Sequence, residues 1–181
     1  MNLNDEKSMA ALAVAMVENP RASYQDLAVA VGVSRATLYR FCKSRDELIL
    51  RLLRHGMQLF SDSIARARLD EGPVPQALMR LVESQLAHRE FSSFLSLHWR
   101  AEAELDPEIM AAWKVQEEAL DRFFLRGQKE GVFRIDIAAA ALNDSFIWLI
   151  CGLVDAERRG RIGRAALAAS IEGLFLRGAS A

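Results

Sequence analysis

Residues 23–48, SYQDLAVAVGVSRATLYRFCKSRDEL, decide the fold of this chain. Ser23 stands three positions before Asp26, which is the spacing of a capping box at the start of a helix over about residues 24–31. Gly32 follows the last apolar residue of that pattern, where a left-handed backbone commonly ends a helix. Ser34 is a good N-cap for a second helix over about residues 35–41. The stretch therefore predicts two short helices joined by a tight glycine turn.

The two short helices have different inner and outer faces. Leu27, Ala28 and Val31 form the inner face of the first, and Leu38 and Phe41 that of the second. The outer surface and the segment after it carry cationic and hydroxyl side chains: Ser34, Arg35, Thr37, Tyr39, Arg40, Lys43 and Ser44. Such side chains bind phosphates and base edges. The pattern predicts a helix-turn-helix that places its second helix in the major groove of double-stranded DNA.

The same spacing also occurs in ordinary helical bundles, where it forms a corner of the core. Six of the twenty residues from 35 to 54 are Lys or Arg, and only two are acidic. A core corner does not explain that excess. Residues 1–55 carry a net charge of +2, whereas residues 56–181 carry −3. The amino-terminal end is therefore expected to be the DNA-binding end.

At these residues the chain resembles the TetR family of transcriptional repressors, whose signature combines a Leu-Ala pair, an Ala-Gly-Val-Ser turn and Thr-Leu-Tyr. Four positions differ from the family pattern: Val31, Ala36, Cys42 and Arg45. None of them breaks the turn, but Ala36 and Arg45 can alter which bases or phosphates are contacted. The matching letters here are Leu27-Ala28, Val31-Gly32-Val33-Ser34, Thr37-Leu38-Tyr39 and Lys43-Ser44-Arg45-Asp46-Glu47-Leu48.

Apolar residues recur with helical spacing along the rest of the chain, and no segment shows the alternation of a strand. Together with the two short helices, the pattern predicts an all-α protein of about nine helices. Residues 1–50 are expected to form a three-helix DNA-binding domain, and residues 51–181 a larger ligand-binding and dimerisation domain. The further helices are expected over about residues 5–18, 46–69, 75–88, 91–104, 106–129, 137–159 and 164–177.

Composition argues against several other classes of protein. Cys42 and Cys151 lie far apart without histidines at metal-ligand spacing, so we expect no disulfide, no metal site and no cofactor. We find no glycine-rich phosphate loop and no nucleophile with an evident base, so we expect no catalytic residues and no enzyme. The amino terminus does not resemble a signal peptide, and no run of 18 apolar residues occurs. These features predict a cytoplasmic protein without a membrane partner.

Aromatic side chains concentrate in the middle of the chain. The resemblance implies that they line a cavity for a small apolar or amphipathic effector, whereas aromatic residues at helical spacing are more often plain core. Both interpretations stay open on the sequence alone. The candidate effector-binding residues are Phe91, Phe94, His98, Trp99, Trp113 and Phe124.

The last two expected helices are more apolar than a covered outer layer requires. In the family such helices pair with their copies across a two-fold axis, and the resemblance implies a homodimer. Burial inside the monomer is the alternative. The candidate dimer-interface residues are Phe146, Ile150, Leu153, Leu167, Ile171, Leu174 and Phe175.

The sequence therefore predicts a ligand-responsive transcriptional regulator, foremost a repressor that binds a palindromic operator as a homodimer and is released by a small molecule. The main alternative is a DNA-bound scaffold or interaction protein without an inducer. A small enzyme on a helical bundle is a second alternative, which convergent titratable groups in a cleft would support.

Overall fold

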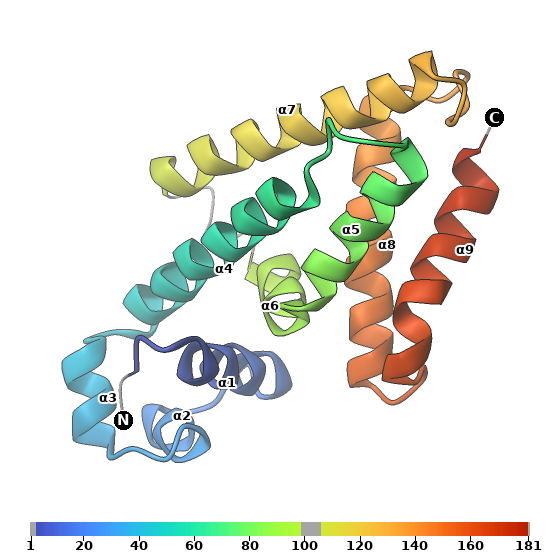
Figure 1. Ribbon diagram of the computed structural model, residues 1–181. Coiled ribbons are helices and arrows are strands. Elements are labelled where there is room, and N and C mark those ends of the chain that lie inside the picture. The colour runs from blue at the N-terminus through green and yellow to red at the C-terminus, as the bar shows by residue number, and fades with distance from the viewer. Residues whose placement is uncertain (1–2, 99–105, 181) are drawn as a thin grey trace. The chain divides into compact units, whose positions relative to one another are not determined.

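The computed structural model describes residues 3–98 and 106–180 (Figure 1). Within these ranges the chain forms helices and no β-strand; its extended pairing is an isolated bridge between Phe133 and Ser180. The all-α prediction is confirmed. The elements are α1 (Glu6–Glu18), α2 (Tyr24–Ala30), α3 (Arg35–Phe41), α4 (Arg45–Ala67), α5 (Val74–Leu86), α6 (Arg89–His98), α7 (Pro107–Lys129), α8 (Ala139–Arg158), the 3-10 turn η2 (Arg164–Ala166) and α9 (Leu167–Ala179).

Helix boundaries follow the capping residues that the sequence supplies. The Asp5 carboxylate accepts a hydrogen bond from the Ser8 amide at 2.7 Å and begins α1. Asp106 accepts from the amides of Glu108 and Ile109 and begins α7. The expected last helix starts three residues late, because residues 164–166 form the 3-10 turn first. Residues 99–104, expected to continue the sixth helix, lie outside the described ranges.

The chain divides into two compact units. Unit 1 comprises residues 1–58 and 90–110, and unit 2 comprises residues 59–89 and 111–181. Helix α4 is continuous over 23 residues, about 35 Å at 1.5 Å per residue, and contributes to both units. The compact units therefore do not coincide with the expected domains 1–50 and 51–181, which describe a division of function and remain a prediction.

The interior of unit 1 fixes the three amino-terminal helices. Leu12 of α1, Leu27 of α2 and Leu38 of α3 are fully buried, as are Leu48 and Leu52 of α4. Helices α1 and α2 pack together, and so do α2 and α3. A bundle of two-turn helices depends on such packing, since isolated helices of this length are not stable in water.

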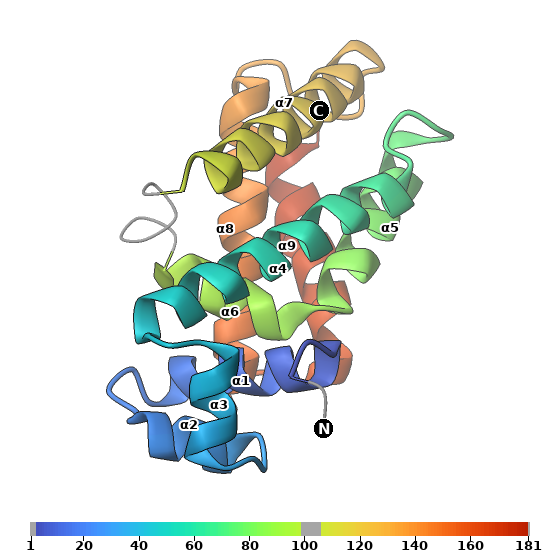
Figure 2. The same cartoon turned by 90° about the vertical axis from the view of Figure 1, so that its left-hand side faces the viewer.

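Unit 2 is centred on phenyl rings. Phe124 lies between neighbours, with ring centroids 5.2 Å from Phe123, 5.4 Å from Phe133, 5.8 Å from Phe146 and 5.7 Å from Phe175. These five residues, called the ring cluster below, come from α7, α8, α9 and the segment after α7. Helices α8 and α9 lie side by side in both views of the ribbon (Figures 1 and 2). The ring cluster thus joins the carboxy-terminal pair of helices to α7.

Candidate nucleic-acid interface

The start of α2 and its connection to α3 both have the geometry that the sequence predicts. Ser23 and Asp26 form a reciprocal capping box: the Ser23 amide donates to Asp26 Oδ2 at 2.8 Å, and the Asp26 amide donates to Ser23 Oγ at 3.2 Å. The hydrogen bonds from Ser23 lower the pKa of the Asp26 carboxyl. Gly32 has a φ of +67°, and the Val33 amide donates to the Ala28 carbonyl at 2.9 Å. The glycine turn is therefore confirmed.

Ser34 begins α3 as an N-cap. Its Oγ accepts a hydrogen bond from the Thr37 amide at 3.1 Å and lies 2.9 Å from the Thr37 hydroxyl. Arg40 Nη2 lies 3.5 Å from the same hydroxyl. These three side chains form a connected polar edge along one turn of α3, which fixes the direction in which the helix presents its hydroxyl groups.

The outer face of α3 remains accessible. Leu38 is the buried residue of this helix, whereas Tyr39 is 56% exposed. Thr37 is partly exposed because Ser34 and Arg40 pack beside it. Six of the seven predicted DNA-contacting residues are exposed in the structure: Ser34, Arg35, Tyr39, Arg40, Lys43 and Ser44.

The segment between α3 and α4 is held by side chains of α2 and α4. The Tyr24 hydroxyl donates to the Ser44 carbonyl at 2.6 Å and lies 3.0 Å from the Cys42 carbonyl. Burial raises the pKa of Tyr24 to about 12, so this donor keeps its proton at neutral pH. Glu47 Oε2 accepts from the Lys43 amide at 2.8 Å. The backbone that carries Lys43 and Ser44 is thereby fixed.

Arg45 has a different role from the one suggested by its place in the motif. Its guanidinium donates to the carbonyls of Ala22 at 3.0 Å and Pro20 at 2.8 Å, in the segment between α1 and α2. A side chain engaged in this way stabilises the packing of the three helices. Ala36 is exposed on α3, and Arg45 is a positioning residue in this structure; the influence of both residues on which bases or phosphates are contacted stays a prediction.

Sequence reasoning missed Tyr24 and Arg45 as positioning residues. It also missed Arg51, whose guanidinium lies 4.4 Å from the centre of the partly buried Phe41 ring and covers one of its faces. Hydrophobic spacing gives no signal for any of the three, because their contacts join residues far apart in the chain. Together, these three side chains fix α3 and the segments next to it in place within unit 1.

Two known transcriptional regulators are similar to this chain in sequence, one of them along nearly its whole length. The HTH-type transcriptional regulator NfxB of Pseudomonas aeruginosa is 48% identical over 178 residues, which cover 98% of this chain and 95% of NfxB. The HTH-type transcriptional repressor LfrR of Mycolicibacterium smegmatis is 34% identical over 115 residues, 64% of this chain and 60% of LfrR. No protein-family model matches the chain.

Solved structures agree with these relatives. The TetR-like regulator LfrR of Mycobacterium smegmatis, in complex with proflavine, has a TM-score of 0.75 at 28% identity and covers 94% of this chain and 92% of its own. This chain belongs to the TetR family of transcriptional regulators. The TetR family regulator PfmR of Thermus thermophilus shares the fold, with a TM-score of 0.72 at 22% identity over 93% of this chain and 96% of its own. The protein is thus a DNA-binding transcriptional regulator and not an enzyme.

The predicted effector-binding residues of this TetR protein fall into both units. In unit 1, Phe91 and Phe94 are buried, and the Phe94 and His98 rings lie 4.5 Å apart. In unit 2, Trp113 stacks on Phe60 at 5.6 Å with an interplanar angle of 19°. Phe124 belongs to the ring cluster and is core. Trp99 lies outside the described residues. The structure brings Phe94 and His98 together in unit 1.

The predicted dimer residues need a correction. Five of them are buried inside the protomer and cannot face a second copy, because their side chains fill unit 2: Phe146, Ile150, Leu167, Ile171 and Phe175. Leu153 is partly exposed and Leu174 is 60% exposed. The hydrophobic pattern could not distinguish the inner from the outer apolar residues of these two helices, and their role in dimerisation stays a prediction.

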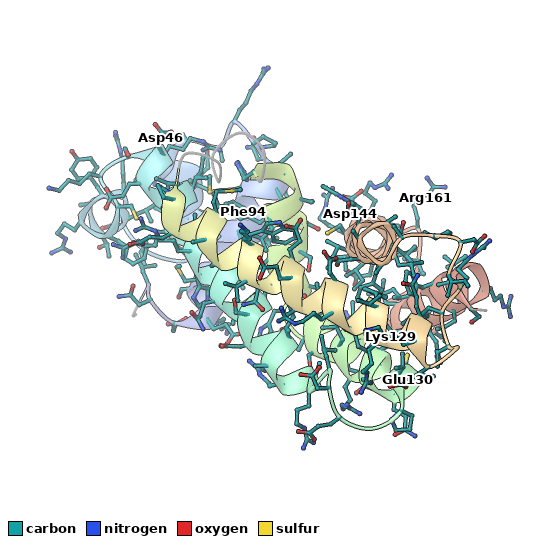
Figure 3. All side chains as sticks on the ribbon, turned by 90° about the horizontal axis from the view of Figure 1, so that it is seen from above. Asp46, Phe94, Lys129, Glu130, Asp144 and Arg161 are labelled. Atoms are coloured by element: carbon teal, nitrogen blue, oxygen red, sulfur yellow. The ribbon has the colours of Figure 1, made fainter. Side chains whose placement is uncertain are left out.

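The outer face of α8 and α9 carries apolar residues other than the predicted dimer residues. Trp148 of α8 is 50% exposed, and added Cβ atoms at Gly152 or Gly173 would meet no described neighbour within 4 Å. Figure 3 views α8 nearly along its axis, with Asp144 on its exposed side. Of the described helices, α8 is long and apolar enough to cross a membrane by its length and composition alone, which is also a common property of an apolar helix in a water-soluble protein. Exposed apolar side chains gathered on one helix face are typical of an interaction surface.

Proposed function

We propose that this TetR protein is a ligand-responsive repressor that binds a palindromic operator as a homodimer and is released by a small molecule. The observation that carries the proposal is the exposed polar face of α3, which lies opposite the buried Leu38 and the partly buried Phe41. Basic side chains would neutralise phosphates, and Arg35, Thr37 and Tyr39 would contact base edges. The proposed DNA-contacting set is Ser34, Arg35, Thr37, Tyr39, Arg40, Lys43 and Ser44.

We assign the two functions to consecutive parts of the chain. We assign DNA reading to residues 1–50, and effector binding and dimerisation to residues 51–181. A regulator of this kind works where its operator lies, which places it in the cytoplasm. The apolar outer face of α8 is then assigned to a protein partner and not to a bilayer.

Dimerisation is proposed through the outer face of α8 and α9. Trp148, Leu153 and Leu174 supply apolar contacts, and Gly152 and Gly173 allow close approach of a second copy. A dimer presents two α3 helices to half-sites about one helical turn apart, which a single seven-residue helix cannot do. The interface is therefore a condition for operator affinity.

Release by a small molecule is supported by the relative LfrR, whose structure was solved in complex with proflavine. An effector in the larger domain would shift the bridging helix α4 and change the spacing of the two reading helices. Coupling of this type amounts to about 1–3 kcal/mol between effector and operator.

Selection from a random pool of duplex DNA, followed by fluorescence anisotropy, tests the proposal. We expect enrichment of a palindrome and a steep loss of affinity with added salt. Enrichment of no sequence, or of a single unrepeated half-site, would contradict it.

Sedimentation tests the interface. Leu174→Asp is expected to yield a monomer with strongly reduced operator affinity. Leu125→Asp is the matched control, because Leu125 is 44% exposed on a different helix, α7, and should leave a dimer. A Leu174→Asp protein that sediments like the wild type would exclude the proposed face.

A further inference from the structure

Three consecutive residues of α4, Arg54, His55 and Gly56, contact residues that come much later in the chain. Arg54 donates to Asp106 Oδ2, with Nε at 2.9 Å and Nη2 at 2.7 Å. The ring centroids of His55 and Phe91 lie 5.1 Å apart. A Cβ added at Gly56 would lie 3.3 Å from Phe91 Cδ1, so α4 and α6 approach each other closely there. This part of α4 therefore joins α6 and the start of α7 within unit 1.

Asp106 uses its two carboxylate oxygens for different partners. It is 4% exposed. Its Oδ1 accepts from the amides of Glu108 at 3.0 Å and Ile109 at 3.3 Å, which begins α7, whereas its Oδ2 accepts from Arg54. Burial alone would raise the pKa of the Asp106 carboxyl, but the hydrogen bonds from Ile109, Arg54 and Glu108 outweigh it and lower the pKa. Asp106 is therefore charged at neutral pH and connects the cap of α7 to α4.

The Arg54–Asp106 pair has a specific place along both helices. Helix α4 leaves unit 1 after Gln58, and α7 leaves it after Met110. Arg54 stands four positions before Gln58, and Asp106 four positions before Met110, which is about one helical turn in each case. Both helices continue without a break into unit 2. The pair thus links the two helices just before each passes from one compact unit to the other.

The exposure of the two partners indicates a geometric role more than a stabilising one. The Arg54 side chain is 57% exposed, whereas that of Asp106 is 5% exposed. Ion pairs with a solvated partner contribute little to stability. A planar guanidinium with two donors on one carboxylate oxygen nevertheless restricts the direction in which its helix can lie. Glu108, with Oε2 3.6 Å from Arg54 Nη2, adds a second negative charge on the same side.

We infer that Arg54 is a positioning residue for operator reading: through Asp106 it links α4 to the start of α7 and thereby fixes the spacing between half-sites that the dimer accepts. The inference rests on the proposed function, because the proposed dimer face lies in unit 2 and the reading helix in unit 1. The spacing of two reading helices then depends on how rigidly α4 and α7 connect these units. Arg54 itself contacts neither DNA nor a second copy in this proposal.

A series of operators that differ in spacer length tests the inference. Each duplex carries the same two half-sites, with the selected spacer or one shorter or longer by a single base pair. We expect Arg54→Met to reduce the preference for the selected spacer over its two neighbours by about three- to tenfold, the range of one net hydrogen bond. An Arg54→Met protein with the spacer preference of the wild type would overturn the inference.

Two further variants identify the contact responsible. Asp106→Asn keeps an N-cap for α7 but loses the negative charge, so it should relax the spacer preference as Arg54→Met does. The double variant should relax it no further, because both changes remove the same interaction. Arg54→Lys retains a cation and should restore part of the preference. Additive effects of Arg54→Met and Asp106→Asn would mean that the two residues act separately, which contradicts the inference.

Arg80→Met is the matched control for a loss of stability. Arg80 donates to the carbonyls of Ala67 at 2.8 Å, Arg68 at 3.0 Å and Glu71 at 2.8 Å, all within unit 2. Its replacement should lower the melting temperature more than Arg54→Met does and leave the spacer preference unchanged. If Arg80→Met relaxes the preference equally, general destabilisation explains the effect and Arg54 has no positioning role.

Distances between spin labels test the same role without DNA. Labels are placed at Glu18→Cys in unit 1 and Arg122→Cys in unit 2, both exposed, in a full chain whose native cysteines are alanine. Mixing with excess unlabelled chain leaves one labelled copy in each dimer. Arg54→Met should broaden the distance distribution measured by double electron–electron resonance, and Arg80→Met should not. An equally narrow distribution for Arg54→Met would overturn the inference.

These measurements separate the inference from the proposed function. A wild type that selects no paired half-sites would refute the palindrome-binding dimer, whereas the label distances would still show whether Arg54 holds the two units in a fixed geometry. A wild type that selects one spacer, together with an Arg54→Met variant that selects it equally well, would refute the role of Arg54 alone.

Discussion

The DNA-reading region and the ring cluster are built from different interactions. Around α3 the structure relies on hydrogen bonds: caps at Ser23 and Ser34, and donors from Tyr24 and Arg45 that hold the backbone on either side. Around Phe124 it relies on apolar rings in mutual contact. The first region keeps its outer surface polar and accessible, and the second stabilises the fold. Substitutions in the two regions should therefore affect different measurements.

The largest effect is expected in the ring cluster. Phe124→Ala leaves a cavity among four rings and should lower the free energy of unfolding by about 3–5 kcal/mol. Urea denaturation measures this change. Leu125→Ala, at the adjacent and exposed position, is the control and should change it by less than about 1 kcal/mol. Equal effects at both positions would mean that Phe124 is not packed as described.

Gly127 should rank next. A Cβ at this position would overlap the Phe133 ring, which is fully buried and cannot move aside. Gly127→Ala should therefore destabilise the protein by about 1–3 kcal/mol, although alanine favours helices. At Gly178 of α9 a Cβ meets no described neighbour within 4 Å, so Gly178→Ala should not destabilise. A Gly127→Ala protein as stable as the wild type would contradict the close approach of Phe133.

Tyr24 tests the hydrogen-bonded region through stability and pH. Tyr24→Phe should cost about 1 kcal/mol of unfolding free energy, the net value of one hydrogen bond. The pKa of Tyr24 in the folded protein is about 12, above its ordinary value of 10. Its stabilisation is therefore complete below pH 10 and is lost as pH rises through 12.

Urea denaturation at about pH 8, 10 and 11 checks this sign. The difference between wild type and Tyr24→Phe should shrink as pH rises. Tyr39→Phe is the matched control, because the Tyr39 side chain is exposed on the outer face of α3. A difference that stays constant or grows with pH would refute the role of the Tyr24 hydroxyl.

The smallest effect concerns a single phosphate contact. Lys43→Ala should weaken binding to all duplexes similarly and lower the salt dependence of affinity by about one unit of slope. Anisotropy titrations at several salt concentrations measure the slope. Lys129→Ala, an exposed lysine at the end of α7, is the control and should leave it unchanged (Figure 3). An unchanged slope for Lys43→Ala would remove Lys43 from the interface.

The comparison also explains what could be predicted from sequence. The caps, the glycine turn and the outer face of α3 depend on residues three or four positions apart. Their pattern can therefore be recognised directly in the amino-acid sequence. The hydrogen bonds of Tyr24 to Ser44 and of Arg45 to Ala22 join positions about twenty apart. Such contacts depend on how helices pack, and no local spacing indicates them.

The two carboxy-terminal helices show that local spacing also cannot predict which apolar residues are buried. Their composition indicated correctly that they carry more hydrophobic surface than one face can bury. In the structure, Phe175 is buried and joins the ring cluster, whereas its neighbour Leu174 is exposed. Both are large and apolar, so only the rotational setting of α9 against α8 distinguishes an interior residue from a surface one. The residues that contact an effector cannot be predicted from local spacing either, because a cavity forms only when the helices pack.

The division of α3 into inner and outer positions has an evolutionary consequence. Since Leu38 and the partly buried Phe41 tie this helix to the rest of unit 1, its exposed positions can be exchanged at little risk to folding. New target sequences are then accessible by substitutions at those positions, with the scaffold beneath left as it is. Paralogues arising by gene duplication could diverge in which promoters they control before diverging in architecture.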